Sequence, residues 1–241
     1  MNQDKIVVVM GGPSTEAEIS RQTGSAILKA LQSKGYNAEG MELNPPTFAE
    51  DIKKSGCAIV FNALHGKFGE DGVLQGTLDM LGIPYTGSGV LAAAVTMDKA
   101  ASKRVFVAEG ISTPRSHTYY RYEMKRDLAT EIEQGFSLPV VVKAASQGSS
   151  IGVYIVETKD ALEDALKEAF SYNDEVLVEE FIRGKELTVA VWGNEEKKEA
   201  FPIIEITTAS GRYDYESKYT KGASTHIIPA RGSAEKTKEI Q

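Results

Sequence analysis

A lysine that precedes a loop of small residues is the feature of this sequence that points most directly to chemistry. The apolar run Leu138–Val142 ends at Lys143, and positions 144–152 are mostly alanine, serine and glycine. A β-branched apolar run predicts a buried strand that would hold the lysine in place. Small residues expose backbone N–H groups and hydroxyls to an anion. We therefore predict a phosphate site here, although the spacing is not that of a P-loop.

A second apolar run ends on carboxylates. Positions 176–178 are Val-Leu-Val, and Glu179 and Glu180 follow at once. Carboxylate oxygens accept hydrogen bonds, and an adenine amino group and ribose hydroxyls would supply the donors. The order leaves open which glutamate faces the adenine and which lies at the surface. Phe181 and Ile182 either sandwich the purine or belong to the core. Together, the two segments predict a nucleotide-binding site.

The composition narrows the class of protein. The chain has 241 residues, 41% hydrophobic and 25% charged, which is typical of a globular protein with more than one core. Its net charge of -7 disfavours binding to nucleic acid or an anionic membrane surface. Cys57 is the only cysteine, and the first residues, Met1–Lys5, do not resemble a signal peptide. No apolar run approaches the ~20 residues of a membrane span. We expect a cytoplasmic protein.

Elements that alternate over residues 1–95 would position the first group of polar residues. Strands are expected at 5–10, 38–43, 57–62 and 83–86, and helices at about 15–35 and 73–81. Thr15 and Glu18 have the spacing of a capping box. Strands that alternate with helices predict a parallel sheet, with ligands at the carboxyl ends of its strands. Gly11–Glu18 and Ala63–Gly72 both lie at such ends.

An alanine-rich helix at about 90–109 leads into two further regions. Residues 96–183 are expected to form an α+β domain, and residues 184–241 a smaller one. The central domain would contain strands at 116–120, 139–143, 152–156 and 176–180 and helices at 125–133 and 159–170. The third would contain strands at 187–191 and 201–206, an irregular stretch at 209–225 and the start of a charged helix at 233–241.

Several ordered segments resemble the D-alanine–D-alanine ligases of the ATP-grasp superfamily. They are Gly11–Ser20, Ala63–Gly72, Pro84–Gly89, Met97–Lys99, Lys143–Gly152, Glu179–Glu186 and Tyr213–Tyr219. The resemblance implies an α/β ATP-grasp fold, in which a Rossmann-like parallel-sheet domain precedes central and C-terminal α+β domains that clamp the nucleotide. It also implies a homodimer in the cytoplasm that uses D-alanine and ATP, with Mg²⁺ or Mn²⁺, for peptidoglycan precursor synthesis.

The resemblance assigns roles to the residues of these segments. Glu16, Ser149 and Tyr219 would form the catalytic group, with Ser149 bonded to both of the others. The same three residues and His65 would bind substrate, with Glu16 holding the ammonium of the first D-alanine. The residues implied for ATP are Lys99, Lys143, Gly148, Ser149, Ser150, Glu179, Glu180, Phe181, Ile182, Glu186 and Lys218. Relatives that make D-alanyl-D-lactate differ at Lys218–Tyr219, so this pair favours dipeptide synthesis.

Simpler structural roles remain open for three of these residues. Glu16 would also suit a helix N-terminus, where a carboxylate complements the dipole. His65 could be a surface histidine, and Lys99 a solvated charge on a helix. Ser149 lacks the His and Asp pattern of a serine nucleophile, and Gly11–Pro13 lacks the glycine spacing of a dehydrogenase.

Two departures from the family pattern matter for activity. Ala144 stands where the family has proline. The family's metal ligands and an arginine lie in segments that do not occur before Gln241, so no metal residue is assigned. We expect a 241-residue chain to show little or no ligase turnover and to keep weak ATP binding. The alternative function is a non-catalytic nucleotide- or D-alanine-binding module.

Overall fold

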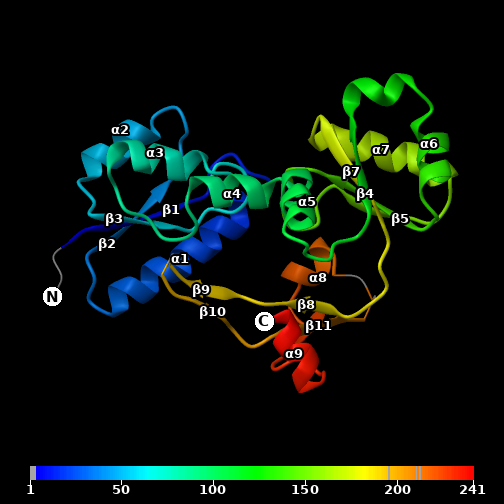
Figure 1. The fold of residues 1–241 in the computed structure, drawn as a ribbon. Coiled ribbons are helices and arrows are strands. Elements are labelled where there is room, and N and C mark those ends of the chain that lie inside the picture. Colours follow the sequence, from blue (N-terminus) through cyan, green and yellow to red (C-terminus); the bar gives the residue numbers. More distant parts are fainter. Residues whose placement is uncertain (1–3, 195, 210, 212) are drawn as a thin grey trace.

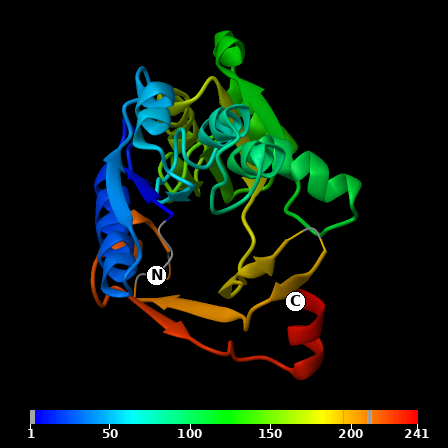
Figure 2. The same cartoon turned by 90° about the vertical axis from the view of Figure 1, so that its left-hand side faces the viewer.

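The computed structural model describes residues 4–194, 196–209, 211 and 213–241. Figure 1 shows a parallel sheet with helices α1–α4 on the left and an antiparallel sheet with α6 and α7 on the right. Short strands and helices α8 and α9 form a third unit below them, and the view of Figure 2 also places it beneath the other two. The expected α/β class is therefore correct. The signal-peptide argument rests on residues 1–5, of which residues 1–3 lie outside the described residues.

The first unit has a three-stranded parallel sheet in the order β2-β1-β3. Its elements are β1 (Ile6–Met10), α1 (Ala17–Ser33), β2 (Ala38–Glu42), α2 (Phe48–Ser55), β3 (Ile59–Asn62) and α3 (Val73–Leu81). Helix α2 was not predicted. The strand expected at 83–86 is reduced to one parallel bridge, Val60 to Tyr85. Two backbone hydrogen bonds join this segment to β3, from Val60 N to Pro84 at 2.8 Å and from Thr86 N to Val60 at 3.1 Å.

Alternation along β1 explains the layers of this unit. Val7 and Val9 pack with Phe48 and Ile52 of α2, whereas Val8 packs toward the apolar side of α1. Successive side chains of a strand point to opposite faces, so an all-apolar strand needs cover on both. Helices on both sides leave the carboxyl ends of the strands free to carry polar groups.

The start of α1 differs from the expected capping box. The helix begins at Ala17, with Glu16 at the N-cap position, and no side chain forms a cap hydrogen bond. Thr15 is exposed and lies one residue too early to cap. Glu18 instead pairs with Arg21 at 3.4 Å on the exposed face. The Glu16 carboxylate is thus left for contacts outside the helix.

The single alanine-rich helix that the sequence predicts is two helices, α4 (Val90–Met97) and α5 (Lys99–Ala108). Asp98 breaks the helix with an extended backbone, and its carboxylate accepts a hydrogen bond from Ala101 N at 2.8 Å. Aspartate is a favoured N-cap residue because it satisfies a backbone donor that the helix leaves unpaired. The break places Lys99 in the first turn of α5.

The second unit is an antiparallel sheet in the order β4-β7-β5-β6. Its elements are β4 (Ser116–Tyr120), the 3₁₀ helix η1 (Arg121–Lys125), α6 (Leu128–Gly135), β5 (Val140–Ala144), β6 (Val153–Val156), α7 (Asp160–Tyr172) and β7 (Glu175–Glu180). Val140, Val142, Val176 and Val178 pack with both helices in one core. Because side chains alternate, Lys143 of β5 and Glu179 of β7 project from the opposite face.

The third unit contains small antiparallel sheets. Its elements are β8 (Glu186–Thr188), β9 (Val191–Gly193), β10 (Lys198–Ala200), β11 (Ile204–Thr208), α8 (Tyr215–Tyr219), β12 (Ser224–Ile227) and α9 (Ala234–Ile240). Strands β12, β11 and β8 form one sheet, and β9 and β10 form a hairpin. The expected charged helix at 233–241 is correct. The stretch expected to be irregular holds α8 and β12; its positions 210 and 212 lie outside the described residues.

A search of the described residues for a helix with the length and apolarity to cross a membrane finds none.

Candidate active site

Two hydroxyl side chains from distant parts of the chain meet at one carboxylate. Ser149, in the loop between β5 and β6, donates a hydrogen bond to Oε1 of Glu16. The hydroxyl of Tyr219, at the end of α8, lies 2.6 Å from Ser149 Oγ and 3.2 Å from the same Oε1 atom. Glu16 is only 3% exposed. The structure thus brings together the residues that the resemblance grouped.

The β5–β6 loop holds an unusual backbone conformation where it reaches Glu16. Ser149 and Ser150 have φ angles of 50° and 63°, in the left-handed region that non-glycine residues rarely adopt. Such residues cost on the order of 1–3 kcal/mol each and persist when surrounding contacts hold them. Ser150 Oγ donates to the carbonyl of Tyr213 at 3.2 Å, so the loop is held on both sides.

The second carboxylate oxygen of Glu16 lies among glycines. A Cβ atom on Gly148 would approach Oε2 to 2.6 Å, and one on Gly66 would approach it to 3.0 Å. Within the part of the chain that the structure describes, no hydrogen bond is formed to Oε2. One oxygen is therefore fixed by two hydroxyls, and the other lies beside the backbone of Gly66 and Gly148.

His65 lies beside this group but does not bond to the carboxylate. Its Nε2 atom is 3.2 Å from the hydroxyl of Thr23 on α1, and its carbonyl accepts from Ser14 Oγ at 2.8 Å. Ser14 Oγ also accepts from Glu16 N at 3.1 Å. These bonds tie the loop that carries His65 to the turn that carries Glu16.

Lysines surround a buried glutamate on the open face of the second sheet. Lys143 Nζ pairs with Oε1 of Glu179, and Lys103 Nζ pairs with Oε2 at 2.8 Å. The Glu179 side chain is 5% exposed and that of Lys103 is 11% exposed. Each oxygen of Glu179 is therefore paired with one ammonium and keeps one lone pair for a further donor. Lys103 was not foreseen, although its position four residues after Lys99 on α5 was a usable signal.

Lys99 connects this lysine group to the β5–β6 loop. Its ammonium donates to the carbonyls of Gln147 and Ala145, and its backbone N–H donates to Ala145 at 3.0 Å. Burial, and next the nearby ammonium of Lys143, lower the pKa of Lys99 to about 8. The ammonium groups of Lys99, Lys103 and Lys143 share this region with one buried carboxylate, that of Glu179. Such a region favours an anion.

The other residues predicted to bind the nucleotide lie around this region and differ in how exposed they are. Glu180 accepts from the backbone N–H of Arg115 at 2.9 Å, Ile182 is 60% exposed and Glu186 is exposed on β8. Lys218, on α8, lies 5.3 Å from the ring centre of Tyr213. Burial lowers the pKa of Lys218, against the raising influence of Glu16 and Glu186. Ile182 is therefore not a core residue.

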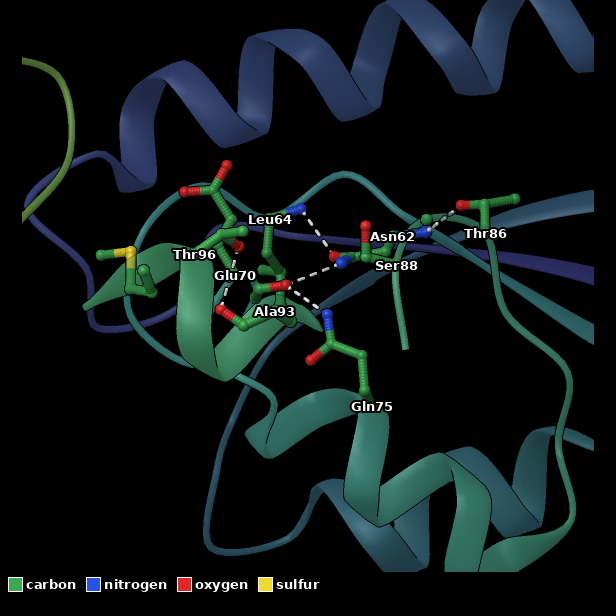
Figure 3. Close-up of a pocket in the computed structure, with 11 residues that line it drawn as sticks. Asn62, Leu64, Glu70, Gln75, Thr86, Ser88, Ala93 and Thr96 are labelled. Carbon is green, nitrogen blue, oxygen red and sulfur yellow. Dashed lines mark hydrogen bonds between the residues drawn. The ribbon is translucent and has the colours of Figure 1, made fainter. Parts of the chain in front are cut away.

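A separate cavity of about 460 Å³ lies at the carboxyl edge of the parallel sheet, between α3 and α4. Figure 3 shows the amides of Asn62 and Gln75 pointing to Gly69, whose carbonyl accepts from them at 2.9 and 2.8 Å. Oε1 of Gln75 is buried and has no hydrogen-bond partner among the described residues. Glu16, Lys143 and Ser149 are not among the lining residues. The sequence did not predict this cavity.

A search of the described residues for three or more His, Cys, Asp or Glu side chains arranged around a possible metal ion finds no such group. The acidic residues of the site are engaged elsewhere: Glu179 pairs with lysines, and Glu16 accepts from hydroxyls. The residues described here do not form a metal site by themselves.

Comparisons with known proteins agree on one family. Residues 38–88 match the model of the D-Ala D-Ala ligase N-terminus, and residues 105–241 match that of the C-terminus. A D-alanine–D-alanine ligase of Desulforudis audaxviator is 49% identical over 94% of this chain and 73% of its own length. The crystal structure of the Bacillus anthracis D-alanine–D-alanine ligase has a TM-score of 0.81 and 35% identity, over 98% of this chain and 75% of that one. Its complex with ATP has a TM-score of 0.80 and 32% identity, over 98% and 74%. This chain belongs to the D-alanine–D-alanine ligase family.

Proposed function

We propose that this protein joins two D-alanines to D-alanyl-D-alanine at the expense of ATP, for peptidoglycan precursor synthesis. The relatives of 40–49% identity carry the name of this activity. One observation in the structure supports it most. The β5–β6 loop contacts two groups of residues. It contacts the Glu16 group (Glu16, Ser149 and Tyr219) through Ser149, and the lysine group (Lys99, Lys103 and Lys143) through the carbonyls of Ala145 and Gln147. A reaction between D-alanine and ATP requires the two substrates to bind close together, and one loop that contacts both groups would achieve this.

The Glu16 group is the proposed site of the first D-alanine. Oε2 of Glu16, which lies beside Gly66 and Gly148 and accepts no hydrogen bond among the described residues, would accept one from the substrate ammonium. Ser149 and Tyr219 would hold the carboxylate in position through Oε1. His65 would contact the same substrate from the neighbouring loop. A fixed acceptor loses less entropy when the substrate binds, which favours affinity.

The lysine group is the proposed site of ATP. Lys99, Lys143 and Lys218, with Gly148, Ser149 and Ser150 of the loop, would face the phosphates. Glu179 or Glu180 would accept from the adenine amino group, and Phe181 and Ile182 would lie against the purine. Glu186 would accept from the ribose. Exposure of Ile182 supports its role as a ligand contact rather than a core residue.

The proposed reaction has two steps. A carboxylate oxygen of the first D-alanine attacks the γ-phosphorus, and the bond to the β-phosphate oxygen breaks, which gives an acyl phosphate and ADP. The amine of the second D-alanine then attacks the acyl carbon, and phosphate leaves as the nitrogen loses a proton. Lysines that offset negative charge and residues that align the reactants would supply most of the catalysis. Dipeptide rather than D-alanyl-D-lactate synthesis is proposed from Lys218–Tyr219.

We propose that ATP arrives as its magnesium complex, because Mg²⁺ commonly binds through substrate phosphates and a few carboxylates. The described residues do not form a site for the ion, so no role in either step is assigned to it.

The proposed domains are residues 1–95, 96–183 and 184–241, since each range contains one of the three units with its own strand pairing. A homodimer is proposed as well. Val73 and Met80 of α3 and Val90 and Leu91 of α4 are exposed apolar side chains that a second copy would cover. We place the protein in the cytoplasm, in keeping with a single unpaired cysteine, Cys57.

This chain spans about three quarters of the length of its relatives, so the test uses the protein at their full length. The protein is incubated with ATP, Mg²⁺ and D-alanine, and phosphate release and dipeptide formation are measured. The proposal predicts release that depends on D-alanine and is not supported by L-alanine. ATP binding without such release would contradict ligation and favour a non-catalytic binding module.

A further inference from the structure

Lys103 holds a position that the nucleotide site does not explain. It lies one helical turn after Lys99 on α5, and its ammonium is 2.8 Å from Oε2 of Glu179. It also donates to the carbonyl of Pro114, just before β4. With 11% of its side chain exposed, Lys103 is more enclosed than Lys143, at 26%. A lysine so enclosed has little access to a ligand and acts chiefly on its carboxylate.

Glu179 links Lys103 to the proposed phosphate site. Its two oxygens take one lysine each, Lys143 on Oε1 and Lys103 on Oε2. Glu179 is 5% exposed, so water offers it little solvation. A buried carboxylate that loses its only partner is strongly unfavourable. If Lys143 were the sole partner, any movement of its ammonium toward a phosphate would leave such a charge behind.

We propose that Lys103 is a positioning residue that keeps Glu179 neutralised and thereby frees Lys143 to bind the phosphates of ATP. This inference rests on the proposed function, because it assumes that ATP occupies the lysine group. Lys103 acts through Glu179 and does not touch the nucleotide. Without Lys103, the Glu179 carboxylate would attract the Lys143 ammonium more strongly, and the interaction of that ammonium with the phosphates would be weaker.

This role makes a prediction that simple structural support does not. Loss of Lys103 should weaken the binding of ligands that carry phosphates and leave the binding of adenosine, which has none, unchanged. If Lys103 only held α5 to the segment before β4, its loss would weaken the binding of ATP and of adenosine equally. The ratio of the two dissociation constants therefore separates the two explanations, and it also cancels any direct contact of Glu179 with adenine.

The experiment is a calorimetric titration of ATP and of adenosine into the protein and its variants. In Lys103→Met, we expect the ATP dissociation constant to rise about tenfold, while that of adenosine changes less than about twofold. Lys103→Arg, which keeps a cation, should retain most of the ATP affinity. Lys159→Met is the matched control, since Lys159 pairs with Glu133 at 3.0 Å in the same unit but at the surface.

Removal of the glutamate charge supplies the decisive comparison. In Glu179→Gln, no carboxylate holds the Lys143 ammonium. Adding Lys103→Met to this variant should therefore leave the ratio of the ATP and adenosine dissociation constants unchanged. This comparison also remains valid if Lys103→Met alone does not fold. A further tenfold loss of ATP affinity in the double variant would overturn the inference, as would an equal loss for adenosine in Lys103→Met. A parent protein that binds adenosine but not ATP would overturn the proposed phosphate site itself, and the inference with it.

Discussion

The hydroxyl of Tyr219 donates a hydrogen bond to Oε1 of Glu16 at 3.2 Å, although 203 positions separate the two residues in the chain. Ser149 bonds to both, so the three units share one buried carboxylate. Burial raises the pKa of Tyr219, which keeps its hydroxyl protonated and able to donate. An arrangement that depends on all three units suits a substrate enclosed between them.

Replacement of Tyr219 by phenylalanine should weaken the binding of D-alanine more than that of ATP. The change removes the hydroxyl that fixes Glu16 and leaves the ring. Loss of a hydrogen bond to a charged group corresponds to about 1.5–3 kcal/mol, so we expect at least about a tenfold higher Michaelis constant for the first D-alanine. Tyr215→Phe is the control, because its ring lies 4.8 Å from that of Tyr219 on the same helix. Equal effects of the two changes would argue against the role of the Tyr219 hydroxyl.

Nucleotide affinity should fall as the pH rises through the range of Lys99. Because the pKa of Lys99 is about 8 in the free protein, its ammonium is charged below that pH and is lost above it. A bound phosphate favours the charged form, so binding takes up a proton at higher pH. Titration with ADP from about pH 7 to about pH 9.5 should show the decline, and Lys99→Met should flatten it. A parent protein whose affinity is constant over this range would contradict the prediction.

The pair of Glu205 and Arg231 should stabilise the third unit down to low pH. Arg231 holds both carboxylate oxygens, at 2.6 and 3.1 Å, and lowers the pKa of Glu205 from 4.5 to about 2. A lowered carboxyl pKa stabilises the fold at pH values above the ordinary pKa of 4.5. This contribution disappears as the pH falls from 4.5 to about 2.

Arg231→Met should therefore lower the melting temperature at neutral pH and lower it less near pH 2, where about half of Glu205 is protonated in the parent protein. The double variant with Glu205→Gln should recover part of the loss, since it leaves no buried charge. A loss of the same size at both pH values would rule out the charge pair as its cause.

Two amides beside the cavity should respond differently to replacement. Asn62 accepts from Leu64 N at 3.1 Å and donates to Gly69, so Asn62→Leu removes both bonds and should cost about 1–3 kcal/mol. Gln75→Met removes one bond but also removes a buried oxygen without a partner, and should change the stability by less than about 1 kcal/mol. Urea unfolding of both variants measures the difference; a larger loss in Gln75→Met would mean that its Oε1 atom has a partner.

The sequence predicted elements where periodicity and composition agree, as in β1 and β5, and it grouped Glu16, Ser149 and Tyr219 through family resemblance. It did not predict the break at Asp98, because alanine-rich helices continue through aspartate unless a cap forms there. It did not predict the partners of Glu179 either. That pairing depends on the antiparallel register of β5 and β7, which aligns Val141 with Glu179. Register is a tertiary property that one strand pattern does not specify.

In the proposed function, the group of Glu16 recognises D-alanine and the group of Lys143 recognises ATP. The most direct measurement compares Glu16→Gln and Lys143→Met, each titrated with ATP and with D-alanine. We predict a crossed result: Glu16→Gln loses D-alanine affinity and keeps that for ATP, and Lys143→Met does the reverse. A charge-assisted bond to the ligand makes each loss about tenfold or more. Equal losses of both ligands in both variants would contradict the account.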